Sequence, residues 1–183
     1  RQRPRRIPRL TKGPGLKLHF SPVGCSRSPH IALREAGLDF ELVRVDLKSH
    51  TLVSDGSDFT AINPKGYVPV LELDDGSRLT EGPAIVQYIA DLKPEAGLAP
   101  KNGTLARYRL QEWLTFINSE IHKGFSPLFR PTTPEEYKSI ARDSLANRLS
   151  YVAAHLEKNA FLLGEQFSVA DAYLFTVLNW CQW

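Results

Sequence analysis

The chain contains no methionine and only two cysteines, Cys25 and Cys181, among its 183 residues. These cysteines lie near opposite ends of the sequence, which excludes the dense disulfide framework of a small secreted domain. No apolar run approaches the roughly 18 residues that a membrane-spanning helix needs, and no stretch has the pattern of a signal peptide. These absences predict a globular, cytoplasmic protein in which Cys25 has a role other than disulfide formation.

Positive charge is concentrated in the first fifteen residues. The whole sequence has a net charge of +3, but the charged side chains of residues 1–15 are all basic, so the remainder is mildly acidic. A segment this rich in Arg, Pro and Gly cannot bury apolar surface, and we interpret residues 1–15 as a disordered basic extension. A nucleic-acid tail or a targeting peptide is the alternative interpretation. Because position 1 is not methionine, we expect that the chain does not begin at its natural start.

Residues 16–92 have the pattern of a small α/β domain. Alternating apolar residues and turn signals predict the order β-α-β, a polar loop at 48–60, and then β-β-α. The predicted strands are residues 16–20, 40–47, 68–73 and 77–80, and the predicted helices are residues 26–36 and 83–92. Gly37 ends the first helix, and Asp74-Asp75-Gly76 forms a hairpin turn. We interpret the Pro- and Gly-rich residues 93–103 as a linker.

Residues 104–183 have the pattern of an all-helical second domain. The predicted helices are a long one capped by Thr104 with a possible stop at Gly124, one at residues 134–156, and one that starts with a capping box at Ser168 and Asp171. The chain ends at Trp183 within an apolar helical pattern. We therefore expect this domain to be incomplete at its C-terminus.

Cys25 is the first candidate functional residue. It follows a strand and the sharp turn Ser21-Pro22-Val23-Gly24, and it occupies the first residue of a predicted helix. Unpaired amides and the positive end of a helix stabilise a thiolate there, so this position favours a reactive cysteine. The alternative is a cysteine that is buried as a small apolar side chain.

Two further segments suit the binding of a small peptide. Val68-Pro69-Val70 places proline within an apolar strand, where it belongs at a sheet edge, and a cis bond would turn the Val68 backbone towards an extended peptide. Thr80-Glu81-Gly82-Pro83 opens a helix whose amides suit a carboxylate, while Glu81 suits an ammonium group. An ordinary edge strand and a carboxylate paired with the helix dipole are the alternatives.

A polar stripe marks the first helix of the second domain. Thr115, Ser119 and His122 are spaced by four and three residues, which places them on one face of a helix rich in aromatic side chains. Such a stripe faces either water or a cleft. A lone histidine is usually a solvated or hydrogen-bonded group, but beside Cys25 it becomes a candidate donor to a thiol.

These motifs resemble the beta-class glutathione transferases of bacteria from about residue 16 to 183. The matching segments are Ser21-Pro22-x-x-Cys25-Ser26, His30-x-x-Leu33-Arg34-Glu35, Asn63-Pro64-Lys65-Gly66-x-Val68-Pro69, Leu79-Thr80-Glu81-Gly82, Ile121-His122-Lys123-Gly124-Phe125 and Ser168-Val169-Ala170-Asp171-Ala172-Tyr173. The resemblance implies a thioredoxin-like, glutathione-binding domain at 16–92 and an all-helical, substrate-binding domain at 104–183 that lacks the family's last helix. It also implies a homodimer that conjugates the glutathione thiolate to small electrophiles.

The same resemblance implies roles for individual residues. Cys25 and His122 would be catalytic, and Cys25 would contact the glutathione sulfur. The backbone of Val68 would pair with the cysteinyl part of glutathione, and Glu81 and Gly82 would hold the γ-glutamyl end. The full implied glutathione-binding set is Cys25, Lys48, His50, Val68, Pro69, Glu81, Gly82, Thr115, Ser119, Glu120, Ile121 and His122.

The sequence also departs from the family pattern. Phe20 stands where many relatives carry tyrosine, so a tyrosine hydroxyl beside the first strand cannot activate the thiol here. Lys48 and His50 are offered where the family has a lysine, and Thr115 replaces an asparagine. The five histidines have no metal-ligand spacing, so we expect no metal. We expect an electrophile pocket between the domains, lined by aromatic residues of the helix that starts at Thr104.

Two other functions are compatible with these residues. The first is a glutathione-dependent thiol-disulfide oxidoreductase in which Cys25 forms a mixed disulfide; no second cysteine lies at Cys-x-x-Cys spacing, so glutathione itself would resolve it. The second is a non-catalytic binding module on the same fold. The joint presence of Cys25, Val68-Pro69, Glu81 and His122 argues against the second.

Overall fold

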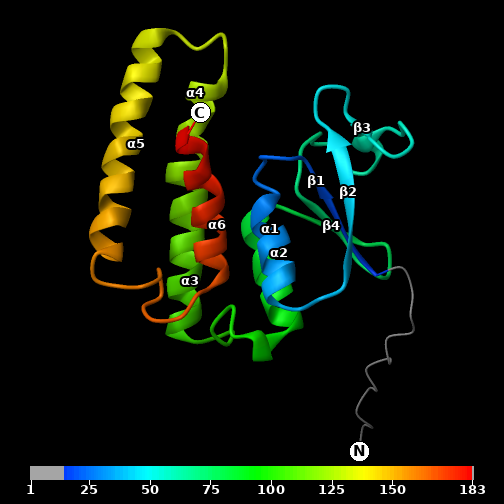
Figure 1. Cartoon of the computed structure of the whole chain (residues 1–183), viewed down its shortest axis with the longest axis horizontal. Coiled ribbons are helices and arrows are strands. Elements are labelled where there is room, and N and C mark those ends of the chain that lie inside the picture. Colours follow the sequence, from blue (N-terminus) through cyan, green and yellow to red (C-terminus); the bar gives the residue numbers. More distant parts are fainter. Residues whose placement is uncertain (1–14, 183) are drawn as a thin grey trace, which may run out of the picture.

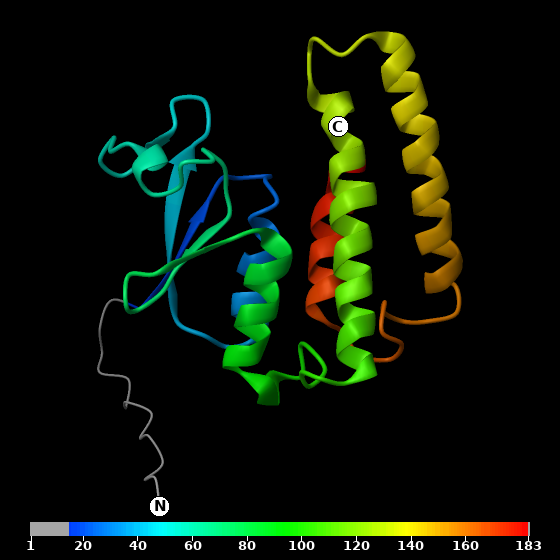
Figure 2. The ribbon, with the colours of Figure 1, turned by 180° about the vertical axis from the view of Figure 1, so that it is seen from behind.

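The computed structural model describes residues 15–182, and it shows a small mixed sheet beside a bundle of helices (Figure 1). The extension predicted at 1–15 therefore lies, apart from Gly15, outside the described residues. Helices α1 (Arg27–Glu35) and α2 (Gly82–Leu92) lie between the sheet and the bundle in both views (Figures 1 and 2). Both helices contact α6 (Val169–Leu178), so α6 joins the two parts of the molecule.

The sheet has five strands in the order β3-β2-β1-β4-β5. The strands are β1 (Leu16–Phe20), β2 (Phe40–Asp46), β3 (Thr51–Leu52), β4 (Val70–Glu72) and β5 (Arg78–Thr80). β1 and β2 are parallel and are joined through α1, and the other neighbours are antiparallel. This β-α-β unit followed by a β-hairpin confirms the predicted thioredoxin-like arrangement.

The polar segment 48–60 is more ordered than the predicted loop. It contains the two-residue strand β3 and a 3-10 turn at Phe59–Ala61. The Asp58 carboxylate accepts a hydrogen bond from the Thr60 amide, which caps this turn, and Phe59 is fully buried. Burial of one aromatic side chain thus anchors a segment whose composition predicts only a loop.

The strand predicted at 68–73 begins later, at Val70. The Val68–Pro69 peptide bond is cis, as predicted, and Pro69 has no amide to donate to a neighbouring strand. The Val68 carbonyl is therefore outside the strand ladder and available to other groups.

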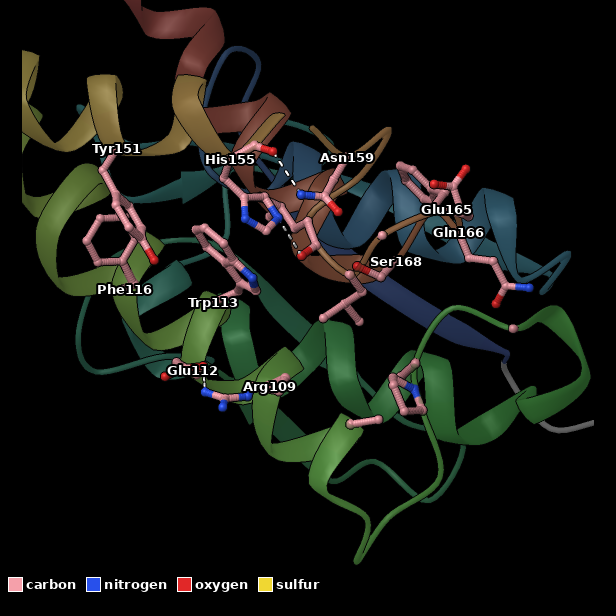
Figure 3. Close-up of a pocket in the computed structure, with 18 of the residues that line it drawn as sticks. Arg109, Glu112, Trp113, Phe116, Tyr151, His155, Asn159, Glu165, Gln166 and Ser168 are labelled. Atoms are coloured by element: carbon pink, nitrogen blue, oxygen red, sulfur yellow. Dashed lines mark hydrogen bonds and ion pairs between the residues drawn. The ribbon is translucent and has the colours of Figure 1, made fainter. Parts of the chain in front are cut away.

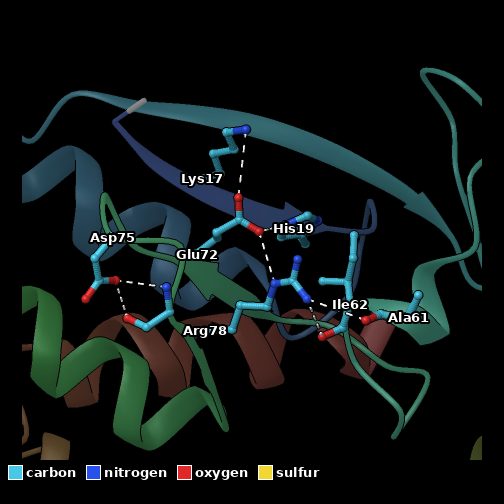
Figure 4. Close-up of polar contacts among 8 residues, drawn as sticks. Lys17, His19, Ala61, Ile62, Glu72, Asp75 and Arg78 are labelled. Carbon is cyan, nitrogen blue, oxygen red and sulfur yellow. Dashed lines mark hydrogen bonds and ion pairs between the residues drawn. The ribbon is translucent and has the colours of Figure 1, made fainter. Parts of the chain in front are cut away.

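A carboxylate on β4 connects three strands to the loop after Phe59 (Figure 4). Glu72 accepts a hydrogen bond from Nε of Arg78 at 3.1 Å and lies 3.8 Å from Nζ of Lys17. Arg78 also donates to the carbonyls of Ala61 and Ile62. Burial lowers the pKa of the neighbouring His19, so this ring packs as a neutral group against the sheet.

The helical part consists of a long rod, a second long helix and a central buried helix. The elements are α3 (Leu105–Phe116), a π-helical segment (Ile117–His122), α4 (Lys123–Phe129), α5 (Glu135–Leu156), α6, and a final 3-10 turn (Asn179–Gln182). Figure 2 shows α3 and α4 as one continuous rod. The stop predicted at Gly124 is therefore wrong. A Cβ at Gly124 would lie 3.3 Å from Leu145 Cδ1, so this glycine allows close approach of α5.

The linker between the two parts is anchored by an ion pair. Arg107 in α3 is 3% exposed, and both of its terminal nitrogens donate to the carboxylate of Asp91 in α2 at 2.8 Å. Arg107 also donates to the carbonyl of Pro100 in the linker. The division at 16–92, 93–103 and 104–183 remains a prediction. Within residues 15–182, no helix combines the length and apolar character needed to cross a bilayer.

Replacement of Asp171 by alanine is expected to lower the free energy of unfolding by about 2 kcal/mol. Its carboxylate accepts hydrogen bonds from the Ser168 amide, the Ser168 hydroxyl and the Leu162 amide, which completes the predicted capping box. Urea unfolding measures the change. Glu136→Ala, an exposed carboxylate in the first turn of α5, is the matched control and should change stability by only a few tenths of a kcal/mol. Equal losses in the two variants would contradict the capping role.

Candidate active site at the junction of the two parts

Cys25 lies in the turn before α1 and not in the first turn of the helix. The helix begins at Arg27 with Ser26 as its N-cap. The partly buried Cys25 thiol donates a hydrogen bond to the Val68 carbonyl at 3.2 Å. Burial raises the pKa of Cys25 to about 11 and outweighs the backbone amides of Cys25 and Ser26, which lower it. Cys25 is therefore a thiol donor at neutral pH in this ligand-free protein, and its predicted reactivity stays a prediction.

The cis-proline loop places a backbone edge next to Cys25. The Val68 carbonyl accepts from the thiol, and no hydrogen bond from the Val68 amide is recorded within residues 15–182. Pro69 is buried behind this edge. The edge thus offers an amide donor to an extended peptide, as the motif predicted.

Lys48 and His50 both lie in the exposed turn between β2 and β3. The Lys48 amide donates to Asp46, and its side chain has no recorded partner within residues 15–182. His50 packs against the loop that leads from Gly66 to the cis-proline. A Cβ placed on Gly66 would lie only 3.0 Å from the His50 imidazole ring. The structure thus brings His50 close to the loop that carries Val68, and Lys48 stays at the rim.

Glu81 stands at the start of α2 in a left-handed backbone conformation, with φ of 69°. Its carboxylate accepts hydrogen bonds from Lys65 Nζ at 2.6 Å and from the Tyr67 hydroxyl at 3.1 Å. The hydrogen bond from Lys65 lowers the pKa of Glu81, so the carboxylate is ionised at neutral pH. Neither Lys65 nor Tyr67 was assigned a role from the sequence, although Lys65 belongs to the Asn63-Pro64-Lys65-Gly66 motif.

His122 is half-buried and points towards α6. Its Nδ1 lies 2.6 Å from the hydroxyl of Tyr173, which also donates to Asn118 Oδ1 at 2.8 Å. Burial, aided by the charge of Lys123, lowers the pKa of His122 to about 4, so the imidazole is neutral near pH 7. A Cβ at Gly82 would lie 3.9 Å from the Tyr173 ring, which therefore sits between His122 and the start of α2.

The rest of the predicted stripe does not converge on His122. The Ser119 hydroxyl donates to the Thr115 carbonyl, and both residues are exposed. Glu120 forms an ion pair with Arg148 of α5 at 2.9 Å, and the Ile121 side chain is fully buried in the core. The π-helical segment changes the direction of side chains after Phe116, which a regular helical spacing does not anticipate. The side chains of Glu120 and Ile121 are therefore removed from the candidate site.

A cavity of about 550 Å³ lies where the two parts meet. Its walls are Pro22 and Val23 from the turn before Cys25, and His122, Ser126, Phe129 and Trp180 from the helical part. The Trp180 indole donates to the Val23 carbonyl at 2.9 Å and packs edge-on against His122, with ring centroids 4.9 Å apart. A cavity thus lies between the parts at the predicted place, and its aromatic residues Phe129 and Trp180 come from α4 and the last turn.

The aromatic residues of α3 line a different and larger groove (Figure 3). This groove, of about 1400 Å³, runs between α3, α5 and the loop before α6. Trp113, Phe116, Tyr151 and His155 form its aromatic part, and Arg109, Glu112 and Glu165 lie along its rim. The aromatic residues of α3 thus line this groove and not the cavity beside the turn before Cys25, and the position of the electrophile pocket stays a prediction.

Comparison with known protein families matches both parts of the chain. Residues 23–92 match the model described as "Glutathione S-transferase, N-terminal domain", and residues 116–182 match "Glutathione S-transferase, C-terminal domain". Glutathione S-transferase GstA of Escherichia coli O157:H7 is 52% identical over 165 residues, which cover 90% of this chain and 82% of that protein. Glutathione S-transferase GST-4.5 of Xanthomonas campestris is 37% identical with the same coverage of both chains.

Solved structures of similar proteins have the same fold. The ternary complex of BphK, a bacterial GST, superposes with a TM-score of 0.89 at 60% identity, covering 91% of this chain and 82% of that one. A sphingomonad glutathione S-transferase complexed with glutathione has a TM-score of 0.86 at 51% identity. A beta-class glutathione S-transferase of Sphingomonas chungbukensis has a TM-score of 0.85 at 50% identity. Each of the last two alignments covers 90% of this chain and 81% of the other.

Proposed function

Because the chain belongs to the glutathione S-transferase family, we propose that its Cys25–His122 site joins the thiol of glutathione to small electrophiles. The observation that carries the assignment of the site is the convergence of Cys25, the Val68 backbone and the Glu81 carboxylate at one end of the sheet, beside a cavity. These groups match the three parts of the glutathione molecule, namely a thiol, a peptide and a zwitterionic γ-glutamyl end.

The γ-glutamyl end binds at the start of α2 in this proposal. The ionised Glu81 carboxylate accepts hydrogen bonds from the ammonium group, and it retains acceptor capacity beside Lys65 and Tyr67. The Gly82 amide donates to the carboxylate, because amides in the first turn of a helix lack partners within the helix. The Val68 amide pairs with the cysteinyl residue, which brings the glutathione thiol towards Cys25.

In this proposal, uncharged hydrogen-bonding groups of the protein activate the thiol of glutathione. In the ligand-free protein the single proton of the Cys25 thiol is donated to the Val68 carbonyl. In this proposal the S–H turns to the glutathione sulfur when glutathione binds, and the hydrogen bond stabilises the thiolate form. Lowering a thiol pKa by two units requires roughly 2.7 kcal/mol, which two or three hydrogen bonds to a charged group supply. Phe20 has no hydroxyl, so this stabilisation comes from Cys25, His122 and backbone amides.

The electrophile occupies the cavity beside His122. Val23, Phe129 and Trp180 provide apolar walls, and a hydrogen bond from the Trp180 indole to the Val23 carbonyl holds two of these walls together. A cavity of this kind favours apolar, preferably aromatic, electrophiles.

We also propose that the protein is a cytoplasmic homodimer. The groove between α3 and α5 leaves apolar aromatic surface in contact with solvent, which is typical of an interface. The two free cysteines, Cys25 and Cys181, suit a reducing compartment. Sedimentation velocity of the full chain distinguishes a dimer from a monomer.

The Glu81→Gln variant is expected to weaken glutathione binding by about tenfold, because an amide cannot form a charge-assisted hydrogen bond with the ammonium group. Isothermal titration calorimetry measures this Kd. A glutathione analogue without the amino group should bind the variant and the unmodified protein equally well. Glu95→Gln is the matched control, since Glu95 is an exposed carboxylate paired with Lys93 at 3.3 Å outside the site. An unchanged Kd for Glu81→Gln would remove Glu81 from the site.

A further inference from the structure

Tyr173 stands at the centre of a hydrogen-bonded chain that joins α6 to the π-helical segment. The residue is almost fully buried, and its hydroxyl oxygen contacts both Nδ1 of His122 and Oδ1 of Asn118. Asn118 and His122 both belong to the π-helical segment, and both side chains contact the Tyr173 hydroxyl. The Tyr173 hydroxyl therefore links the His122 imidazole to the neutral side-chain amide of Asn118.

The direction of each hydrogen bond follows from the donor and acceptor inventory. A carbonyl oxygen only accepts, so the Tyr173 hydroxyl donates to Asn118 Oδ1 at 2.8 Å. If the hydroxyl donated to His122 instead, two acceptor oxygens would face each other at that distance. The hydroxyl has one proton, and its oxygen must accept from His122. With the Asn118 amide oriented so that Oδ1 faces the hydroxyl, Nδ1 of His122 carries the imidazole proton and the lone pair lies on Nε2.

The environment keeps both groups neutral. Burial raises the pKa of Tyr173, and the negative charge of Glu81 raises it further, so the hydroxyl stays protonated. Burial lowers the pKa of His122, so its free nitrogen remains an acceptor near neutral pH. No hydrogen bond to Nε2 is recorded within residues 15–182, and His122 lines the cavity next to the turn before Cys25.

We propose that Asn118 and Tyr173 are positioning residues that hold His122 in the Nδ1–H tautomer, so that Nε2 accepts the proton of the glutathione thiol. In this step the S–H bond breaks, its electron pair stays on sulfur, and the proton forms an N–H bond at Nε2. The resulting imidazolium keeps its Nδ1–H bond to Tyr173. The inference rests on the proposed function, since it gives His122 a direction within that site.

The tautomer is measured directly by nuclear magnetic resonance on the ligand-free, ¹⁵N-labelled full chain. Long-range ¹H–¹⁵N correlations distinguish a protonated from an unprotonated ring nitrogen, and the His122→Gln variant identifies the His122 signals. The expected result is a protonated Nδ1 and an unprotonated Nε2. The opposite tautomer would overturn the inference, because His122 would then be a donor to the thiolate and not an acceptor from the thiol.

Variants of Asn118 test whether the hydrogen bonds that link Asn118, Tyr173 and His122 determine the tautomer of His122. In Asn118→Leu the Tyr173 hydroxyl loses its acceptor and turns to Nδ1, so the tautomer should invert to Nε2–H. The turnover number kcat should then fall by about a hundredfold, the lower range for loss of a general base, while KM for glutathione changes little. Asn118→Asp keeps an acceptor oxygen and should keep the Nδ1–H tautomer. An Asn118→Leu protein that keeps this tautomer would overturn the positioning role.

The control and the two readouts separate this inference from the proposed function. Ser150→Leu introduces the same apolar side chain at an exposed position of α5 outside the groove between α3 and α5, and it should leave both tautomer and turnover unaltered. Conjugation by a protein with the Nε2–H tautomer would overturn the inference and leave the proposed function intact. Absence of conjugation with the Nδ1–H tautomer present would overturn the proposed function and, with it, the proton-accepting role.

Discussion

Replacement of Asp91 by alanine is expected to lower the free energy of unfolding by about 2–3 kcal/mol, because it leaves the buried Arg107 guanidinium without its carboxylate. Removing one partner of a fully buried ion pair costs about 3–5 kcal/mol. The expected loss is smaller here, since the Asp91 side chain is 41% exposed and water reaches it. The pair connects α2 to α3, so its loss should also loosen the junction that carries the cavity.

Urea unfolding at pH 7 measures the change in stability. Asp143→Ala is the matched control, because Asp143 is an exposed aspartate within a helix, as Asp91 is at the end of α2. Arg107→Leu in the Asp91→Ala background should recover part of the loss, since it removes the unpaired buried charge. A loss below about 0.5 kcal/mol, the scale of a surface ion pair, would contradict this role.

The same ion pair predicts a dependence of stability on pH. Burial raises the pKa of Asp91, but hydrogen bonds from Arg107 and Asn102 outweigh it and hold the pKa below the ordinary value of 3.8. The unfolded chain therefore binds a proton at higher pH than the folded protein does. The contribution of Asp91 is present above its unfolded pKa and is lost as the pH falls through its folded pKa. The stability difference between the unmodified protein and Asp91→Ala should accordingly shrink below about pH 4.

Replacement of Cys25 by serine is expected to abolish thiol-disulfide exchange while conjugation survives. A serine hydroxyl donates a hydrogen bond to the glutathione sulfur as the Cys25 thiol does, so kcat/KM for conjugation should fall by at most about tenfold. Disulfide exchange requires the sulfur itself as nucleophile, and a hydroxyl cannot form the mixed disulfide. Any glutathione adduct that mass spectrometry detects on the unmodified protein should therefore be absent from Cys25→Ser.

The His122→Ala variant provides the comparison, because it leaves Cys25 in place and removes the group proposed to accept the proton. Its kcat/KM for conjugation should fall by about a hundredfold. A generic aryl halide and a small mixed disulfide are the two substrates, and the ratio of their catalytic efficiencies in the unmodified protein decides the main activity. Strong disulfide reduction without conjugation of any electrophile in a varied panel would overturn the proposed function.

The state of Cys25 in the structure favours conjugation over exchange. A thiol donating to the Val68 carbonyl, with its pKa raised to about 11, is a poor nucleophile at neutral pH and a serviceable hydrogen-bond donor. From the sequence, the start of a helix was expected to lower the pKa of the Cys25 thiol. Helix α1 starts two residues after Cys25, and burial has the larger effect on its pKa.

The sequence by itself determined the features that depend on local chemistry. The cis bond before Pro69, the turn at Gly76 and the capping box of Ser168 and Asp171 follow from which residues tolerate a given backbone or complete a given cap. The order of strands and helices likewise follows from apolar periodicity. These features were sufficient to predict the order of elements and to point to Cys25 and Glu81, and the resemblance of the motifs to a known family supplied the fold.

Only the tertiary structure decided which side chains meet. Tyr173 and Asn118 are 55 residues apart, and the π-helical segment that directs Asn118 and His122 towards Tyr173 interrupts the helical period from which side-chain directions are predicted. Burial determined the protonation states of Cys25 and His122. Gly124 lies inside a continuous helical rod, where its missing side chain lets Leu145 of α5 pack closely against it. Contacts and burial of this kind arise between distant segments, so no local pattern in the sequence contains them.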